Sequence, residues 1–288
     1  MECIKFNGVE KTLGNFNLKI DDLKIKKGFI TGFVGPNGAG KTTTIKLIMN
    51  MLFPDKGEVT VDGIKVNNEN NIIIKEKIGY VGVEPGFIEG NSIKTTVKVL
   101  KGFYKNWDDN KYKRFVKELN IDESKEIGDL SSGNKKLLQI AVALSTCPEI
   151  IIMDEPTANL DPIVRNQILE ILQQEMENEN TTIFYSTHIT TDLDKAADYT
   201  IFILDGKIVL EDETDNILSE YVVIKGDRRF ISNETKDGLI GIKENRFGFQ
   251  ALAKNKKKAF EIFGEEVVYD KATIEDVLLY LGGGRGNE

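Results

Sequence analysis

The sequence predicts an α/β fold, and three observations support this prediction. Short apolar runs of strand length alternate with segments whose apolar residues recur at helical spacing. The apolar run FITGFV stops abruptly at the glycine-rich GPNGAGKT, and an amphipathic helical pattern follows directly. The content of 40% hydrophobic and 29% charged residues is ordinary for a globular protein, and 288 residues suffice for one large domain and a small one.

The N-terminal half predicts strands, one central helix and a helical insert. Residues 1–34 alternate apolar and polar positions before they become continuously apolar, which is typical of strands. Asp62-Gly63 lies between two such runs and predicts a hairpin turn, and KIGYVGV predicts a further strand. Between about residues 87 and 129 the apolar residues return to helical spacing. We therefore expect a helical subdomain inserted between strands.

The second half begins with a helical pattern that Pro148 closes, followed by the strand EIIIM. A helix from about residue 162 to 176, the strand TTIFYST and a hairpin around Asp205-Gly206 follow. Beyond about Ser219 the sequence contains short strand patterns and a final helix in which Thr273 and Asp276 are spaced as a capping box. We therefore divide the chain into residues 1–218 and a small C-terminal α/β domain, residues 219–288.

Charge and cysteine content exclude several classes of protein. The net charge of −8 does not favour binding to a phosphate backbone, so we expect no nucleic acid partner. Cys3 and Cys147 are too few for a disulfide framework and fit a reducing cytosol. No window approaches 18 consecutive apolar residues, so the sequence predicts no membrane span.

GPNGAGKT, Gly35 to Thr42, fits the phosphate-binding pattern G-x-x-x-x-G-K-[ST] in full. Glycines let backbone N–H groups turn toward phosphates, Lys41 reaches the β and γ oxygens, and Thr42 offers a hydroxyl to Mg²⁺. A plain glycine-rich turn is the alternative. The strand before and the helix after it favour a nucleotide site.

A carboxylate pair follows the predicted buried strand EIIIM. Asp154 falls at the tip of this strand, where it can hold Mg²⁺ directly or through water. Glu155 follows immediately, and we interpret it as the base that polarises the attacking water. The alternative is a solvated pair at a strand end.

Four motifs together resemble a known family. GPNGAGKTT, LSSGN, IIIMDEPTANLD and STH occur in the order, and at about the separations, found in the ATP-binding subunit of ABC transporters. The resemblance covers residues 1 to about 218 and implies the ABC type of phosphate-loop NTPase fold, with a mixed sheet core, an antiparallel β subdomain and a helical subdomain. FYKNWDDNKY and STHITTDLDKAADYTIFILDGKIV look most like the bacitracin-resistance and acetoin-utilisation type, which includes peptide exporters of Gram-positive bacteria.

The resemblance implies an ATPase that works as a head-to-tail dimer with two ATP molecules between its subunits. Its cofactors would be ATP and Mg²⁺. Ser131 and Gly133 of LSSGN would reach the γ-phosphate held by the other subunit, and Asp161 would link the two sites. The triphosphate would be bound by Gly35, Pro36, Asn37, Gly38, Ala39, Gly40, Lys41, Thr42 and Thr43.

His188 is the only histidine in the chain, and a lone histidine is by default more often structural than catalytic. The strand before it should lie parallel to EIIIM, which brings His188 near Asp154 and Glu155. Its resemblance to the family's switch histidine implies that it senses the γ-phosphate and orients Glu155 and water.

The resemblance also implies partners and a location. A separate transmembrane permease subunit would be driven by a homodimer or heterodimer of ATP-binding subunits, and the helical subdomain would carry the docking surface. The chain would then be cytoplasmic and peripheral on the inner face of the cell membrane. We expect export of peptide or another amphipathic compound.

Three departures from the family pattern stand out. LSSGN replaces LSGGQ, with Ser132 and Asn134 at the altered positions. The family normally has a glutamine after the strand that corresponds to KIGYVGV, and this chain has Val83 at that position. The side chain of Val83 cannot ligate a metal, while Glu84 could contact it if the loop shifts by one residue. For adenine stacking the candidates are Leu13 and Phe16. We favour Phe16, with a core phenylalanine as the alternative.

Two other functions are weighed against transport. In soluble ABC-type ATPases of DNA repair, a long coiled coil separates the phosphate loop from the family's signature motif, which is LSSGN in this chain. Here Lys41 and Ser131 are only 90 positions apart (131 − 41). Translation factors of this type usually carry two ATP modules. A binding-only regulator with a dead site is disfavoured by the intact Glu155 and His188.

Overall fold

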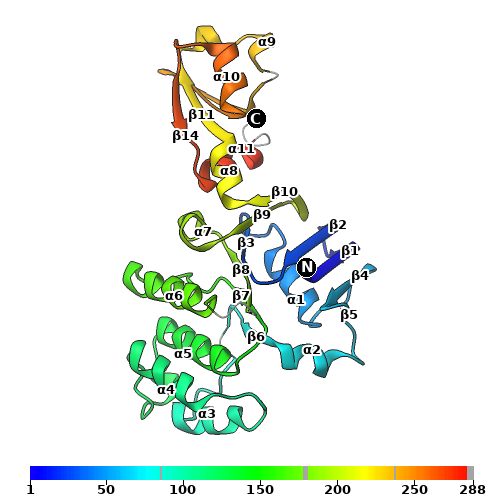
Figure 1. Ribbon diagram of the computed structural model, residues 1–288, viewed down its shortest axis with the longest axis vertical. Helices are drawn as coiled ribbons and strands as arrows, with labels where there is room; N and C mark the ends of the chain where they lie inside the picture. Colours follow the sequence, from blue (N-terminus) through cyan, green and yellow to red (C-terminus); the bar gives the residue numbers. More distant parts are fainter. Residues whose placement is uncertain (85, 178–180, 237, 284–288) are drawn as a thin grey trace.

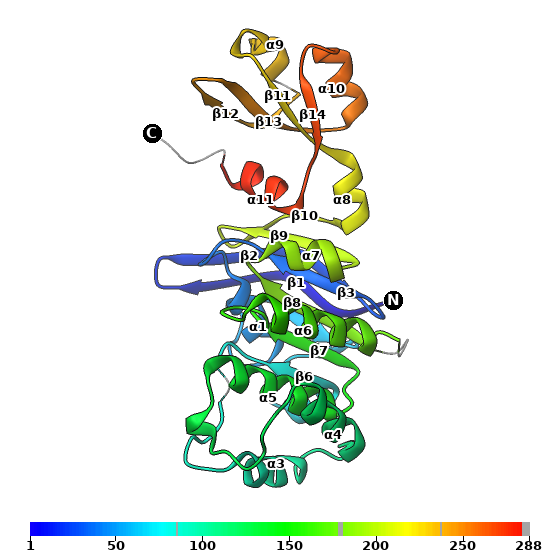
Figure 2. The ribbon, with the colours of Figure 1, turned by 90° about the vertical axis from the view of Figure 1, so that its left-hand side faces the viewer.

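The computed structural model describes residues 1–84, 86–177, 181–236 and 238–283. Within these residues the strands form three sheets: two lie side by side, and the third, formed by C-terminal strands, lies further along the long axis of the molecule (Figure 1). A helical segment lies at one end of this axis and a C-terminal unit, residues 221–283, at the other (Figure 2). The predicted mixed sheet core, antiparallel β subdomain and helical subdomain are confirmed.

The central sheet carries the strand ends on which the motifs lie. Its order is β10-β9-β3-β8-β7-β6, parallel except for the antiparallel β9–β10 hairpin. Buried parallel strands need apolar residues on both faces, which accounts for the continuous apolar runs. The strands are β3 (Ile30–Val34), β6 (Ile78–Val81), β7 (Ile150–Asp154), β8 (Thr182–Thr187), β9 (Tyr199–Leu204) and β10 (Lys207–Glu213).

An antiparallel sheet of order β2-β1-β4-β5 lies beside the central sheet. Its strands are β1 (Glu2–Leu13), β2 (Phe16–Lys26), β4 (Lys56–Val61) and β5 (Ile64–Lys65). The predicted turn at Asp62-Gly63 is confirmed, and its φ angles of 47° and 77° are those of a tight hairpin. Helix α1 (Lys41–Ile48) contacts both sheets, and its Ile45, Leu47 and Ile48 are buried between them. Helix α2 (Asn71–Lys77) leads into β6.

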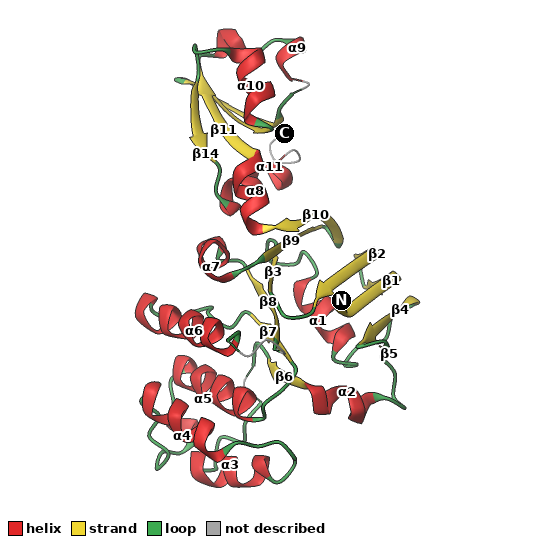
Figure 3. Ribbon diagram, viewed as in Figure 1, coloured by secondary structure: helices red, strands yellow, loops and turns green. Residues whose placement is uncertain are grey.

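The helical segment is inserted in the chain between β6 and β7, as the sequence predicts, and in space it lies beyond β6 at one end of the molecule (Figure 3). It consists of α3 (Ile93–Lys101), α4 (Asp109–Glu118), the short 3₁₀ turn Ile127–Asp129 and α5 (Ser132–Ser145). Helices α6 (Pro162–Glu175), α7 (Thr190–Ala196) and α8 (Thr214–Glu220) follow β7, β8 and β10 respectively. Asp161 caps α6, because its Oδ1 accepts hydrogen bonds from the Ile163 and Val164 N–H groups at 3.0 and 3.1 Å.

The C-terminal unit is a third sheet, of order β12-β13-β11-β14, with helices against it. The predicted capping box of the last helix is confirmed, since Thr273 and Asp276 exchange hydrogen bonds. Strand β13 and helix α10 are additions that the sequence patterns did not predict. The elements are β11 (Tyr221–Gly226), the 3₁₀ turn Arg228–Phe230, α9 (Asn233–Lys236), β12 (Ile240–Asn245), β13 (Gly248–Lys254), α10 (Lys256–Phe263), β14 (Val268–Lys271) and α11 (Ile274–Gly282).

One buried cluster joins the central sheet to the C-terminal unit. It runs from the sheet residues Ile30 and Phe202 through Leu193 of α7 to Val277 of α11 and Leu252 of β13. Helix α11 contacts α7 on one side and β12 and β13 on the other. The two parts therefore share apolar packing. Across the described ranges, each helix is too short or too polar to cross a membrane.

Candidate active site

The phosphate loop joins β3 to α1 and depends on glycine at defined positions. A Cβ on Gly35 would lie 2.2 Å from the Ile203 carbonyl oxygen, so only glycine fits there. Gly38 and Gly40 have φ angles of 81° and 113°, which other residues rarely adopt. The loop can therefore bring its backbone close to an anion, and the N-terminus of α1 follows directly.

Lys41 is the first residue of α1, and its side chain is buried within the loop. Its Nζ donates to the Gly35 carbonyl oxygen at 2.7 Å and to that of Pro36 at 3.2 Å. Thr42 and Thr43 follow in the first helical turn and are half-buried. The loop thus has a cation and two hydroxyl groups at its helical end.

Asp154 ends β7 and is completely buried. Its Oδ1 accepts a hydrogen bond of 2.6 Å from the Ser186 hydroxyl, whereas its Oδ2 has no partner among the described residues. An unpartnered buried carboxylate oxygen is costly, and a divalent cation satisfies it. This oxygen therefore fits Mg²⁺, and the Thr42 hydroxyl, in the first turn of the helix α1 that contacts β7, is a second oxygen donor.

Glu155 connects the phosphate loop to His188. Its Oε1 lies 3.3 Å from Nζ of Lys41, and its Oε2 lies 2.7 Å from Nδ1 of His188. The His188 backbone N–H also donates to Oε2, at 3.3 Å. The ring contact is a hydrogen bond from His188 to the carboxylate in the tautomer whose hydrogen is on Nδ1. Three motifs distant in sequence thus meet at one carboxylate.

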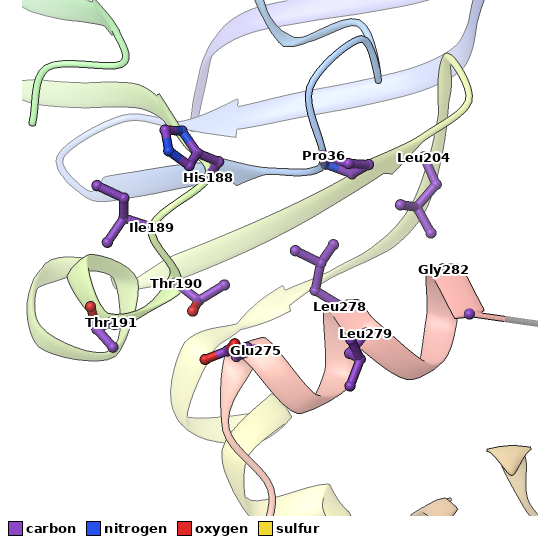
Figure 4. Close-up of a pocket in the computed structure, with 11 residues that line it drawn as sticks. Pro36, His188, Ile189, Thr190, Thr191, Leu204, Glu275, Leu278, Leu279 and Gly282 are labelled. Carbon is purple, nitrogen blue, oxygen red and sulfur yellow. The ribbon is translucent and has the colours of Figure 1, made fainter. Parts of the chain in front are cut away.

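His188 lies where β8 ends, and 46% of its side chain is exposed. A cavity of about 660 Å³ lies beside it, between Pro36 of the phosphate loop and helix α11 (Figure 4). Leu278 points from α11 into this cavity, below Pro36 and His188 in the figure. The C-terminal unit therefore lies directly beside the site.

The signature residues lie at the start of α5. Ser131 is the N-cap, and its Oγ accepts the Asn134 N–H at 3.2 Å while the residue stays exposed. Gly133 is close-packed, since a Cβ there would lie 3.1 Å from Cδ2 of Leu160. An exposed hydroxyl at a helix start is available to a second molecule.

Val83 and Glu84 line different cavities. Val83 lines a small cavity of about 130 Å³ together with Glu155 and Lys136. Glu84 is exposed and lines a groove of about 410 Å³ together with Tyr80 and Gln139. Of the two, Val83 is the neighbour of the predicted base.

Phe16 begins β2 and is half-buried beside the phosphate loop, since a Cβ on Gly40 would lie 3.0 Å from its Cζ. Its cross-strand partner Leu13 is exposed. Both candidates for the adenine contact therefore lie at one edge of the loop.

Sequence reasoning missed two polar residues near Asp154 and Glu155. Ser186 holds Asp154 through its hydroxyl and the Glu155 N–H through its hydroxyl and carbonyl oxygens. Lys136 lies on the buried face of α5. The available signals were a hydroxyl at the end of an apolar strand and a lysine at a buried helical position.

Comparison with known proteins identifies the family. A family model described as ABC transporter matches residues 18–158. YtrB, an ABC transporter ATP-binding protein of Bacillus subtilis, is 30% identical over 212 residues, which cover 74% of this chain and 72% of YtrB. This chain belongs to the ABC transporter ATP-binding proteins.

The ABC ATPase has further relatives. The bacitracin transport ATP-binding protein BcrA of Bacillus licheniformis is 30% identical over 240 residues, covering 82% of this chain and 74% of BcrA. The ATP-binding cassette MJ0796, in a dimeric structure with ADP and Pi, has a TM-score of 0.65 at 25% identity and covers 73% of this chain and 98% of its own. The predicted family and ATPase activity are confirmed.

Proposed function

We propose that this ABC ATPase binds ATP with Mg²⁺ and hydrolyses it at the site built on Gly35–Thr43, Asp154, Glu155 and His188. The contact of Glu155 with both Lys41 and His188 carries this proposal. Glu155 would polarise the attacking water, and His188 would orient Glu155 and sense the γ-phosphate. Lys41 would exchange its contacts with the loop carbonyls for phosphate oxygens.

Thr42 and Asp154 are the residues that would hold Mg²⁺. The buried, unpartnered Oδ2 of Asp154 supports this assignment. The ion would neutralise charge on the β and γ oxygens of ATP. Glu84 would join this set only if its segment shifts toward Glu155, and Phe16 would stack on adenine.

A second ATP-binding subunit, identical or different, would complete each site. Ser131 and Gly133 would reach across to the γ-phosphate of the other subunit, since a hydroxyl and an N–H at a helix start suit an anion. The exposure of Ser131 and the dimeric MJ0796 structure support this arrangement.

A transmembrane permease subunit would dock on the groove lined by Glu84. The groove lies between β6, α3 and α5, and the partly exposed Met51 and Tyr104 line it. Phe103 precedes Tyr104 in the chain, and its side chain is 77% exposed. Such a grouping is typical of a protein interface. The ATPase would thereby be held at the inner face of the cell membrane, with residues 1–218 performing the ATP chemistry.

We further propose that the transporter exports a peptide or another amphipathic compound, a proposal supported by the similarity to BcrA. Membrane vesicles that carry the complete transporter should accumulate labelled peptide in an ATP-dependent manner when they are inside-out. Accumulation only in right-side-out vesicles would indicate import and contradict this proposal.

The variant Glu155→Gln tests the proposed catalysis. Because Gln keeps the shape of Glu155 but is a poor base, ATP should still bind while turnover falls by about 100-fold or more. Single-turnover hydrolysis and equilibrium ATP binding measure the two effects. Normal turnover would show that Glu155 is not the base.

The variant Phe103→Glu tests the docking groove. A charge placed in an apolar interface should abolish copurification with the membrane subunit and leave ATP binding intact. Phe247→Glu is the matched control, since Phe247 is similarly exposed but lies in the C-terminal unit. Copurification that persists in Phe103→Glu would argue against this groove.

A further inference from the structure

Lys136 is a buried lysine to which the proposed function assigns no role. It lies in the second turn of α5, and only 7% of its surface is exposed. Its neighbours along the buried face, Leu137 and Ile140, belong to the apolar core. Removing an ammonium from water is costly, so a lysine at such a position needs specific partners.

The partners of Lys136 are backbone carbonyl groups of the segment that follows β6. Its Nζ donates to the Gly82 oxygen at 2.5 Å and to the Val83 oxygen at 3.1 Å. Among the described residues, no carboxylate forms an ion pair with it. Lys135 differs, because its Nζ contacts Glu89 Oε1 at 2.8 Å. Lys136 therefore joins α5 to residues 82 and 83.

The same ammonium lies close to the catalytic carboxylates. Lys136, Val83 and Glu155 line one small cavity with Ser132 of the signature. Burial lowers the pKa of Lys136, and the nearby charges of Asp154 and Glu155 oppose this shift. The cation thus occupies the place where the segment after β6, the start of α5 and the loop after β7 converge.

We propose that Lys136 is a positioning residue for ATP hydrolysis, which fixes residues 82 and 83 to the first turns of α5 and so holds Val83 beside Glu155. Val83 has no polar side chain with which to bond its surroundings, and the contacts of Lys136 with the Gly82 and Val83 carbonyl oxygens hold the backbone there instead. The segment and the signature residues at the start of α5 then move as one body. This inference rests on the proposed role of Glu155.

Steady-state kinetics of the full-length protein with ATP and Mg²⁺ test this role. In Lys136→Met the stem is retained but both hydrogen bonds are lost, so we expect kcat to fall about tenfold, which corresponds to about 1.4 kcal/mol in the barrier. ATP affinity should stay within about threefold, because Lys136 does not contact the phosphate loop. The adjacent Lys135→Met is the matched control and should retain normal kcat.

Two further readouts separate positioning from a general structural role. Hydrogen exchange of the amides at residues 80–84 should accelerate in Lys136→Met and not in Lys135→Met. The free energy of unfolding should change little, since the loss of two hydrogen bonds is offset by the replacement of a buried cation with an apolar side chain. A fall in stability parallel to the fall in kcat would overturn the proposal, as would normal kcat in Lys136→Met.

A second variant covers the case in which Lys136→Met does not fold. Lys136→Gln keeps a polar donor but shortens the side chain, and its kcat should fall by a smaller factor than in Lys136→Met. Wild-type kcat in Lys136→Gln overturns the proposal. Glu155→Gln is assayed in parallel: normal turnover there overturns the proposed base, whereas an inactive Glu155→Gln beside a fully active Lys136→Met overturns only the role of Lys136.

Discussion

Glu155 adopts a left-handed backbone conformation, with a φ angle of 51°, directly after the buried Asp154. A non-glycine residue pays a conformational cost there, and the surrounding contacts must hold it in place. Ser186 supplies them, because its hydroxyl and carbonyl oxygens both accept the Glu155 N–H, at 3.1 and 3.2 Å. This turn directs the carboxylate of Glu155 to Lys41 and His188 rather than along the strand.

The variant His188→Ala should suppress hydrolysis while ATP still binds. Alanine removes the ring that contacts Glu155 Oε2, yet leaves the Lys41 loop contacts intact. We expect turnover to fall by about 100-fold, in the range that single acid–base or electrostatic groups contribute. Measurement of kcat and of equilibrium ATP affinity separates the loss of hydrolysis from a loss of binding. A normal kcat would show that His188 has no role in hydrolysis.

Asp192 of α7 is buried and should give the protein a measurable pH dependence. Burial raises its pKa above the usual 3.8, while the hydrogen bond from the Thr157 hydroxyl opposes the shift. A carboxyl group with a raised pKa in the folded state stabilises the fold most below pH 3.8, and this contribution is lost as the pH rises through the folded-state pKa.

The variant Asp192→Asn removes this titration and keeps an oxygen that can accept from Thr157. Its free energy of unfolding, relative to wild type, should therefore increase as the pH is raised from 3.8 toward neutrality. Urea denaturation at several pH values measures the difference. A difference independent of pH would contradict the assignment to Asp192.

At the scale of elements, the site depends on connections between parallel strands and helices. The carboxyl ends of β3, β7 and β8 lie side by side, so the phosphate loop, Glu155 and His188 converge at one edge of the sheet. Neighbouring strands determine how much space each connection has. The phosphate loop passes so close to β9 that the Ile203 carbonyl oxygen leaves no room for a side chain at Gly35.

The variant Gly35→Ala tests this close approach. Its Cβ would lie 2.2 Å from the Ile203 oxygen, so the loop must shift, and overpacking of this kind costs about 1–3 kcal/mol. We expect ATP affinity to fall by more than tenfold, as measured by equilibrium titration. Gly90→Ala is the control, because no atom lies within 4 Å of its Cβ position, and it should bind ATP normally.

At the scale of the whole molecule, the C-terminal unit shares its core with the ATPase. The cluster that contains Leu252 of β13 also contains Phe115 of α4, at the far end of the long axis. Cooperative unfolding follows such continuous packing. The only tryptophan, Trp107, lies between α3 and α4 and packs against the apolar cluster of the helical segment, so its fluorescence reports on that distant end.

The variant Leu252→Ala should therefore shift the unfolding transition seen by Trp107. Truncation of a fully buried leucine lowers the free energy of unfolding by about 2–5 kcal/mol. If the core unfolds as one cooperative unit, this loss also lowers the stability of the region around Trp107. Urea denaturation followed by fluorescence measures the midpoint. The exposed Phe247→Ala should leave it unchanged, and an unshifted midpoint in Leu252→Ala would show that the C-terminal unit unfolds independently.

The sequence by itself determined the fold class, the phosphate loop and the Asp154–Glu155 pair, because local spacing encodes each of them. Helical and strand periodicity, the glycines of the loop and the order of four motifs need no contact between distant residues. The short helix α7 was not predicted, since it contributes little more than Leu193 to the shared core. The strand β13 was not predicted, since its apolar residues are divided between two clusters: Leu252 in the shared core, and Phe249, Ala251 and Ala253 in the C-terminal unit.

Only the tertiary structure decided how these residues meet. It brought Lys41 and His188 to opposite oxygens of Glu155, and placed Val83 rather than Glu84 in the cavity beside that carboxylate. It also buried Lys136 against the backbone of residues 82–83. Strand order and helix packing set these contacts, and both depend on burial of apolar surface over the whole chain rather than on local sequence.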